Sequence, residues 1–91
     1  MKAVRLTISG DVQGVGYRAW AMRIGVELGL RGWVRNRFDG TVEMLVIGAE
    51  NSVAVMIEAA RRGPRAARVS AVQVDDDEDS GSRGFVALPT A

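Results

Sequence analysis

The chain has 91 residues, a formal net charge of +1 and a hydrophobic fraction of 47%, which together indicate one soluble domain over residues 1–91. It has no cysteine and no histidine, which excludes disulfides, thiol nucleophiles and histidine-based metal or acid–base sites. The small net charge argues against a dedicated nucleic-acid-binding protein. Because no signal peptide or membrane-spanning stretch is evident, we expect a cytoplasmic protein.

The chain opens with a strand, a glycine-rich segment and a helix. Residues 3–9 alternate between apolar and polar, which predicts a half-buried strand with Val4, Leu6 and Ile8 on its buried face. From about residue 18 the apolar residues recur with the period of a helix. Gly29 is suited to a left-handed C-terminal cap of that helix.

A hairpin, a second helix and further strands follow. The turn signal Asp39-Gly40 and the caps Asn51-Ser52 and Gly63-Pro64 bound these elements. In chain order they are predicted at residues 32–37, 41–47, 53–62, 68–74 and 85–88.

The resulting order, β-α-β-β-α-β, predicts a fold of the α+β class. Two β-α-β units joined by a hairpin give the ferredoxin-like split β-α-β sandwich, an antiparallel sheet of four strands. Right-handed crossovers place both helices on one face of that sheet, so we expect the other face to be largely open. The fold hosts many functions, and the function has to be argued from a site.

The stretch GDVQGVGYR at residues 10–18 lies between the first strand and the first helix. A helix N-terminus presents unpaired N–H groups, and a glycine-rich turn before it can bring its own N–H groups to an anion. Arg18 adds a planar fork of donors suited to phosphate. Glycine-rich turns of this kind also occur without a ligand, and the stretch is neither a dinucleotide fingerprint nor a P-loop. The segment alone leaves both interpretations open.

Asn36 is the second candidate, near the end of the predicted strand over residues 32–37. Its amide can donate to one group and accept from a water molecule. The competing interpretation is that Asn36 helps to end a strand beside the turn that follows.

Two long motifs resemble the acylphosphatase family. They are GDVQGVGYR at residues 10–18 and LGLRGWVRNRFDGTVE at residues 28–43, and the resemblance continues through RRGPRAARV at residues 61–69 and GF at residues 84–85. It covers nearly the whole chain, with both motifs at the expected spacing.

The resemblance implies a hydrolase that cleaves the carboxyl–phosphate bond of acyl phosphates, with no metal and no organic cofactor. It implies that Arg18 binds the phosphate and that Asn36 positions the attacking water. The phosphate-binding loop is expected to comprise Gln13, Gly14, Val15, Gly16, Tyr17 and Arg18. We expect a monomer that acts on a small-molecule acyl phosphate, with no nucleic-acid or membrane partner.

Three positions depart from the usual pattern of the family. Asp11 stands where a basic residue is common and places an acid beside the anion site, although we expect it to point away. Ala21 replaces a hydroxyl residue, and Gly25 replaces an alanine within the helix, at a cost of about 1 kcal/mol. None of these changes touches Arg18 or Asn36.

The sequence supports other functions less well. Single-stranded RNA binding on the sheet is disfavoured because the strands over residues 3–9 and 41–47 carry no aromatic residue. A domain that handles carbamoyl phosphate in a larger hydrogenase-maturation protein, or a non-catalytic anion-binding domain, remains the alternative. The acidic run at residues 75–79 matches no calcium loop and is predicted to be a solvated loop. Trp20 and Trp33 are predicted to be packing residues.

Overall fold

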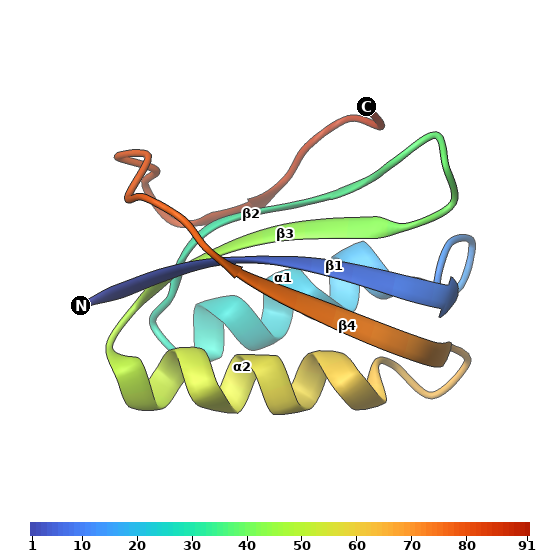
Figure 1. Cartoon of the computed structure of the whole chain (residues 1–91), viewed down its shortest axis with the longest axis horizontal. Coiled ribbons are helices and arrows are strands. Elements are labelled where there is room, and N and C mark those ends of the chain that lie inside the picture. The colour runs from blue at the N-terminus through green and yellow to red at the C-terminus, as the bar shows by residue number, and fades with distance from the viewer.

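A computed structural model describes residues 1–91, and its elements follow the order expected from the sequence (Figure 1). The elements are β1 (Lys2–Asp11), α1 (Tyr17–Glu27), β2 (Arg31–Asn36), β3 (Val42–Gly48), α2 (Glu50–Arg62), β4 (Arg68–Asp76) and β5 (Phe85–Ala87). The predicted β-α-β-β-α-β order is confirmed. β5 corresponds to the short final strand predicted at residues 85–88.

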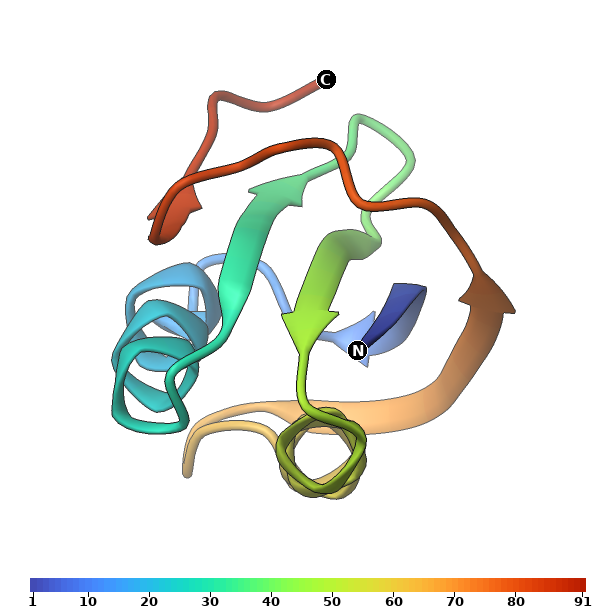
Figure 2. The same cartoon turned by 90° about the vertical axis from the view of Figure 1, so that its left-hand side faces the viewer.

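The five strands form one sheet in the order β4-β1-β3-β2-β5. The first four strands in this order pair antiparallel with one another, and Met44 of β3 lies opposite both Leu6 of β1 and Val34 of β2. Both helices cover the same face of this sheet (Figure 2). β1 and β2 therefore run in the same direction with β3 between them, which is the split arrangement that the sequence predicted.

The last strand changes the expected sheet of four antiparallel strands. β5 pairs with β2 in parallel, with Phe85 opposite Gly32. The chain leaves β4 at one edge of the sheet, crosses the face that the helices do not cover and reaches the other edge (Figure 2). Because the chain reverses direction once after β4, β5 runs with β2 rather than against it.

The core lies between the sheet and the two helices. Its 15 buried residues include the whole predicted inner face of β1, where Val4, Leu6 and Ile8 are each 0% exposed. Val53, Met56 and Ala60 supply the buried stripe of α2. Burial of one large aliphatic side chain contributes about 1.5–3 kcal/mol, so these residues account for much of the stability of the fold.

Three of the four helix ends predicted from the sequence are confirmed by the structure. Gly29 after α1 and Gly63 after α2 have φ values of 69° and 66°, the left-handed region that glycine adopts readily. α1 begins at Tyr17, close to the expected start. The predicted cap at Asn51-Ser52 is wrong, because α2 begins at Glu50 and Val53 N–H donates to the carbonyl of Ala49. Glu50 in the first turn complements the helix dipole, so a side-chain cap is dispensable there.

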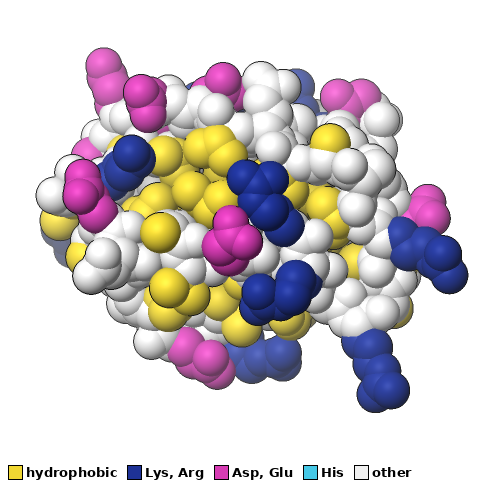
Figure 3. All heavy atoms as spheres, turned by 60° about the horizontal axis from the view of Figure 1, so that its bottom comes forward, with side chains coloured by type: hydrophobic (Ala, Val, Ile, Leu, Met, Phe, Trp, Pro, Cys, Tyr) yellow, Lys and Arg dark blue, Asp and Glu magenta, His cyan; other side chains and the backbone are white.

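On the side of the molecule that α2 covers, apolar side chains gather across the middle of the view, with charged side chains among and around them (Figure 3). Val55 of α2 and Val74 of β4 are 52% and 39% exposed, which is ordinary for single surface residues. No helix has the length and apolar character needed to cross a membrane.

The sheet face away from the helices is more covered than the sequence led us to expect. Leu45 and Ile47 alternate with the inward-facing residues of β3, yet they are only 3% and 0% exposed. The segment of residues 77–84 passes over this face on its way to β5 (Figure 2). Polar anchors hold the segment: Asp77 pairs with Arg5 at 2.8 Å, and Arg31 binds Asp79 and the carbonyl of Ser82.

The acidic run at residues 75–79 is the predicted solvated loop only in part, since its residues are exposed except for Asp77. Asp75 and Asp76 belong to β4, and Asp77 and Asp79 form ion pairs. The Arg31 guanidinium lowers the pKa of Asp79 by hydrogen bonding to it. The charge pattern alone could not reveal the partners, because both arginines come from distant strands.

Gly25 in the middle of α1 faces the ring of Phe85. A Cβ atom at this position would lie 2.6 Å from Cγ of Phe85, well inside van der Waals contact. Gly25 itself is buried. The glycine that appears unfavourable for the helix therefore permits β5 to pack closely against α1.

Gly25→Ala is expected to lower the free energy of unfolding by about 1–2 kcal/mol, because overpacking exceeds the gain in helix propensity. Denaturant unfolding measures the change. The same substitution in a Phe85→Ala background should instead raise the free energy of unfolding by about 0.5–1 kcal/mol, since the ring is gone. A loss of stability in both backgrounds would contradict this explanation of the glycine.

Candidate active site

The segment between β1 and α1 takes a conformation that requires glycine at two positions. Gly14 and Gly16 have φ values of 73° and 78°, and a Cβ atom at either one would meet nothing within 4 Å. The backbone angle therefore selects glycine here, rather than a lack of space. The open space in front of these two residues leaves their backbone accessible to a ligand.

Gly16 is also the N-cap of α1, and it provides no side chain to the helix end. No side chain caps the helix, and its first turn contains no acidic residue. The first intrahelical hydrogen bond runs from Trp20 N–H to the carbonyl of Gly16, so the N–H groups of Tyr17, Arg18 and Ala19 have no partner within the helix. The positive end of the helix dipole is thus left for an anion.

A cavity of about 330 Å³ lies at this helix end. It is lined by Gly14, Gly16, Arg18, Ala19, Met22, Asn36 and Ala87. The structure thereby brings together the two candidates Arg18 and Asn36, which are 18 residues apart in the sequence and come from α1 and β2. Neither side chain makes a hydrogen bond or an ion pair within the protein, so both are free to bind a ligand.

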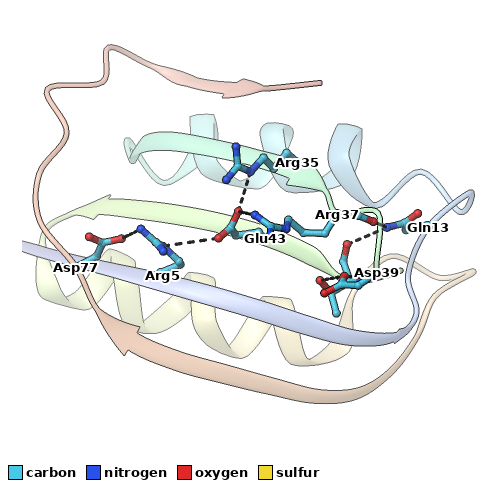
Figure 4. A network of polar contacts seen from close by, with 8 residues as sticks. Arg5, Gln13, Arg35, Arg37, Asp39, Glu43 and Asp77 are labelled. Atoms are coloured by element: carbon cyan, nitrogen blue, oxygen red, sulfur yellow. Dashed lines mark hydrogen bonds and ion pairs between the residues drawn. The ribbon is translucent and has the colours of Figure 1, made fainter. Parts of the chain in front are cut away.

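Gln13 has a different role from the rest of the predicted loop. Its amide Nε2 donates to the carbonyls of Arg37 and Thr41, at 2.7 and 2.9 Å (Figure 4). These two carbonyls belong to the turn between β2 and β3, directly after Asn36. The Gln13 side chain therefore joins the loop to the strand end that carries Asn36.

The side chains of Val15 and Tyr17 point into the protein rather than into the cavity. Val15 packs against the core cluster, and the Tyr17 hydroxyl donates to the carbonyl of Ala60 at 2.8 Å. Burial raises the pKa of this hydroxyl. Tyr17 also packs edge-to-face on Trp20, with ring centroids 5.2 Å apart, which agrees with the packing role predicted for Trp20. Of these two loop residues, only backbone groups are available to an anion.

A cluster of charged residues that the sequence analysis missed lies on the other face of the sheet. Glu43 is 8% exposed and accepts hydrogen bonds from Arg35 at 2.7 Å and Arg37 at 3.3 Å, with Arg5 also close (Figure 4). The Arg35 guanidinium stacks on Trp33, 4.7 Å from the ring centroid. The only sequence signal for this cluster was the presence of outward-facing charges on three neighbouring strands. Those charges could not be assigned to pairs without the register between the strands.

The three departures from the usual pattern lie apart from the cavity. Asp11 is exposed at the end of β1 and Ala21 is 0% exposed in the core, while Gly25 packs against Phe85. None of them lines the cavity. No group of three or more histidine, cysteine, aspartate or glutamate side chains is arranged to hold a metal ion.

Comparison with known proteins points to one family. The sequence pattern of the acylphosphatase family matches residues 4–87. A protein named acylphosphatase from Rhodospirillum rubrum is 47% identical over 90 residues, which is 99% of each chain. The crystal structure of acylphosphatase from Bacillus subtilis is 34% identical, superposes with a TM-score of 0.93 and covers 97% of this chain and 99% of its own. The structure of HypF from T. kodakarensis is 33% identical with a TM-score of 0.85, but only 12% of that chain is matched.

Gln13→Ala should lower the free energy of unfolding by about 1–3 kcal/mol, because two hydrogen bonds are lost. It should also weaken the binding of inorganic phosphate, because the loop is no longer tied to the strand end. Thermal unfolding and titration calorimetry measure the two effects. Gln73→Ala is the matched control, since the Gln73 amide is exposed and binds only Asp75.

Gln13→Glu sharpens this test, because a carboxylate has the same shape but no proton to donate. At pH 7 it should be less stable than Gln13→Ala, since it faces two carbonyl oxygens. Those oxygens should raise the pKa of the new carboxyl, so stability should return as the pH falls through that raised pKa and the acid donates one hydrogen bond. Equal phosphate affinity in the wild type and both variants would mean that the loop holds its shape without the amide.

Proposed function

The chain belongs to the acylphosphatase family and hydrolyses the carboxyl–phosphate bond of acyl phosphates, and from this premise we propose that Arg18 binds the phosphate and Asn36 orients the attacking water. The backbone N–H groups from residue 13 to the start of α1 complete the anion site. The observation that carries the proposal is that Arg18 and Asn36, whose side chains have no partner in the protein, line one cavity beside an uncapped helix end.

The phosphate part of the proposal follows from charge and shape. An acyl phosphate presents a dianionic group with three terminal oxygens. The N–H groups at the start of α1 can each donate to one oxygen, and the Arg18 guanidinium can donate two parallel hydrogen bonds. The backbone donors are fixed by the loop and the helix before the substrate arrives, so they can stabilise negative charge in the transition state without reorganisation, and Arg18 adds its charge to them.

The chemical step needs little beyond positioning. A water oxygen forms a bond to phosphorus while the bond from phosphorus to the carboxylate oxygen breaks, and the carboxylate leaves with that electron pair. The proton of the water passes to the new phosphate or to solvent. Because a carboxylate is a good leaving group, no strong general acid is required, and orientation of the water is the main task left. A neutral amide such as that of Asn36 can accept a hydrogen bond from the water at any pH.

We further propose that the reaction uses no metal and no organic cofactor. The support is chemical, since the donors of Arg18 and α1 supply the charge that a metal would otherwise supply. Monomeric state, cytoplasmic location and the absence of a nucleic-acid partner stay predictions. The match to a small part of HypF means that this domain shape also occurs within a longer chain, and a hydrolysis assay separates a catalytic domain from one that only binds the anion.

Arg18→Ala is expected to reduce kcat/KM for benzoyl phosphate at least 10²-fold, since each charge-assisted hydrogen bond contributes about 1.5–3 kcal/mol. Arg18→Lys should lose at least about tenfold, because an ammonium cannot reproduce the planar fork. Phosphate release is measured in excess chelator, together with inhibition by inorganic phosphate. Arg23→Ala on the exposed side of the same helix is the control and should match the wild type. Unchanged phosphate inhibition in Arg18→Ala would remove Arg18 from the anion site.

Asn36→Ala is expected to lower kcat by roughly 10²–10³-fold, as the loss of one preorganised group does in other enzymes. Inhibition by phosphate should stay near the wild-type value, because Arg18 and the loop are intact. Thermal unfolding of the same sample tests that the variant is folded. Asn51→Ala, at an exposed asparagine of α2, is the control. A folded Asn36→Ala with normal turnover would show that another group holds the water.

A further inference from the structure

The cavity extends beyond the part that would hold the phosphate. Its polar end is formed by Gly14, Gly16, Arg18 and Asn36. The other three lining residues are apolar: Ala19, Met22 and Ala87. A volume of about 330 Å³ is within the range of sites for small organic molecules, so the cavity has room for more than an inorganic anion.

The apolar residues lie on both walls, at a similar distance from the phosphate end. Met22 follows Arg18 by one turn of α1, or about 5–6 Å along the helix. Ala87 pairs with Val34, two residues before Asn36, which is about 6–7 Å back along β2. Met22 on the helix and Ala87 on β5 therefore face the same part of the cavity.

The geometry points to an acyl-group subsite formed by Ala19, Met22 and Ala87, which takes substrates whose acyl chain is a hydrocarbon, with Met22 as the residue that determines specificity. This inference rests on the function proposed above. With the phosphate held at the loop, the acyl carbon is attached to one of its oxygens, and the chain has to extend where the cavity continues. No charged side chain lines that part of the cavity.

Met22 is suited to such a role by its chemistry. It is half-buried and packs against the core cluster with part of its length, so its position is defined. Its unbranched side chain can adapt to chains of different length. Ala19 and Ala87 are exposed, so a bound chain would be only partly covered.

The partial cover sets the size of the expected effect. Complete burial of one methylene group corresponds to roughly a fourfold gain in binding. An acyl chain that lies against one half-buried and two exposed residues should gain about half of that binding free energy. This corresponds to about twofold tighter binding per methylene. The subsite should therefore favour longer chains gradually, without excluding acetyl phosphate.

The test compares kcat/KM for acetyl, butyryl and hexanoyl phosphate, each divided by its spontaneous hydrolysis rate. In the wild type we expect a rise of about fourfold for every two methylenes, hence about 16-fold from acetyl to hexanoyl. Met22→Gln keeps the length of the side chain but makes it polar, and the ratio of hexanoyl to acetyl should fall to about twofold. Met22→Leu should restore most of the ratio. Val26→Gln, at a residue of α1 that is 64% exposed and outside the cavity, should leave it unchanged.

Two results would overturn the subsite. One is equal kcat/KM for all three chains in the wild type, and the other is an unchanged ratio in a folded Met22→Gln variant. In either case, continued loss of activity in Arg18→Ala would leave the proposed function intact. Hydrolysis of all three substrates that does not depend on Arg18 would instead reject the proposed site, so the two failures are distinguishable.

Discussion

The site depends on the direction of two strands that do not touch. β1 and β2 run in parallel with β3 between them. The loop after β1 and the residue at the end of β2 therefore lie at the same end of the strands. Two strand spacings, about 10 Å, separate these chain segments. Gln13 spans this gap by bonding to carbonyls of the turn that begins β3, and it thereby fixes the loop relative to Asn36. If β2 ran antiparallel to β1, the two catalytic candidates would lie at opposite ends of the molecule.

The distribution of ion pairs keeps Arg18 available. Arg5, Arg31 and Arg35 each have a carboxylate partner, whereas Arg18 has none and lies beside a helix end with no acidic residue. A guanidinium next to unpaired N–H groups concentrates positive potential that only a ligand neutralises. Anion binding should therefore stabilise the folded state, by about 2.7 kcal/mol at a phosphate concentration 100 times the dissociation constant.

Local sequence signals predicted most of the fold and the two central residues of the site. Alternation in β1, the Gly29 and Gly63 caps and the Asp39-Gly40 turn each arise from a few adjacent residues. Arg18 and Asn36 were candidates on their chemistry and position, and the resemblance of two long motifs supplied their expected roles. Two of the features that were missed depend on contacts distant in sequence, namely Gln13 with the turn and Gly25 with Phe85. The third, Glu43 with Arg35 and Arg37, spans only the β2-β3 hairpin, but it depends on a strand register that was unknown. The start of α2 was misplaced because backbone geometry at Ala49, rather than a capping side chain, begins the helix.

The short last strand has a consequence for self-association. An unpaired strand edge is a template on which a second chain can add, and proteins limit this risk by keeping edges short. β5 extends over only three residues, yet it occupies hydrogen-bonding groups of β2 that would otherwise face solvent. The segment that delivers it is held by the ion pairs of Asp77 and Asp79 and by backbone hydrogen bonds to Ala3 and Gly32. High salt or acid weakens these exposed pairs, but it leaves the backbone hydrogen bonds of β5 and the burial of Phe85, so we expect the edge of β2 to stay covered until the fold itself is lost.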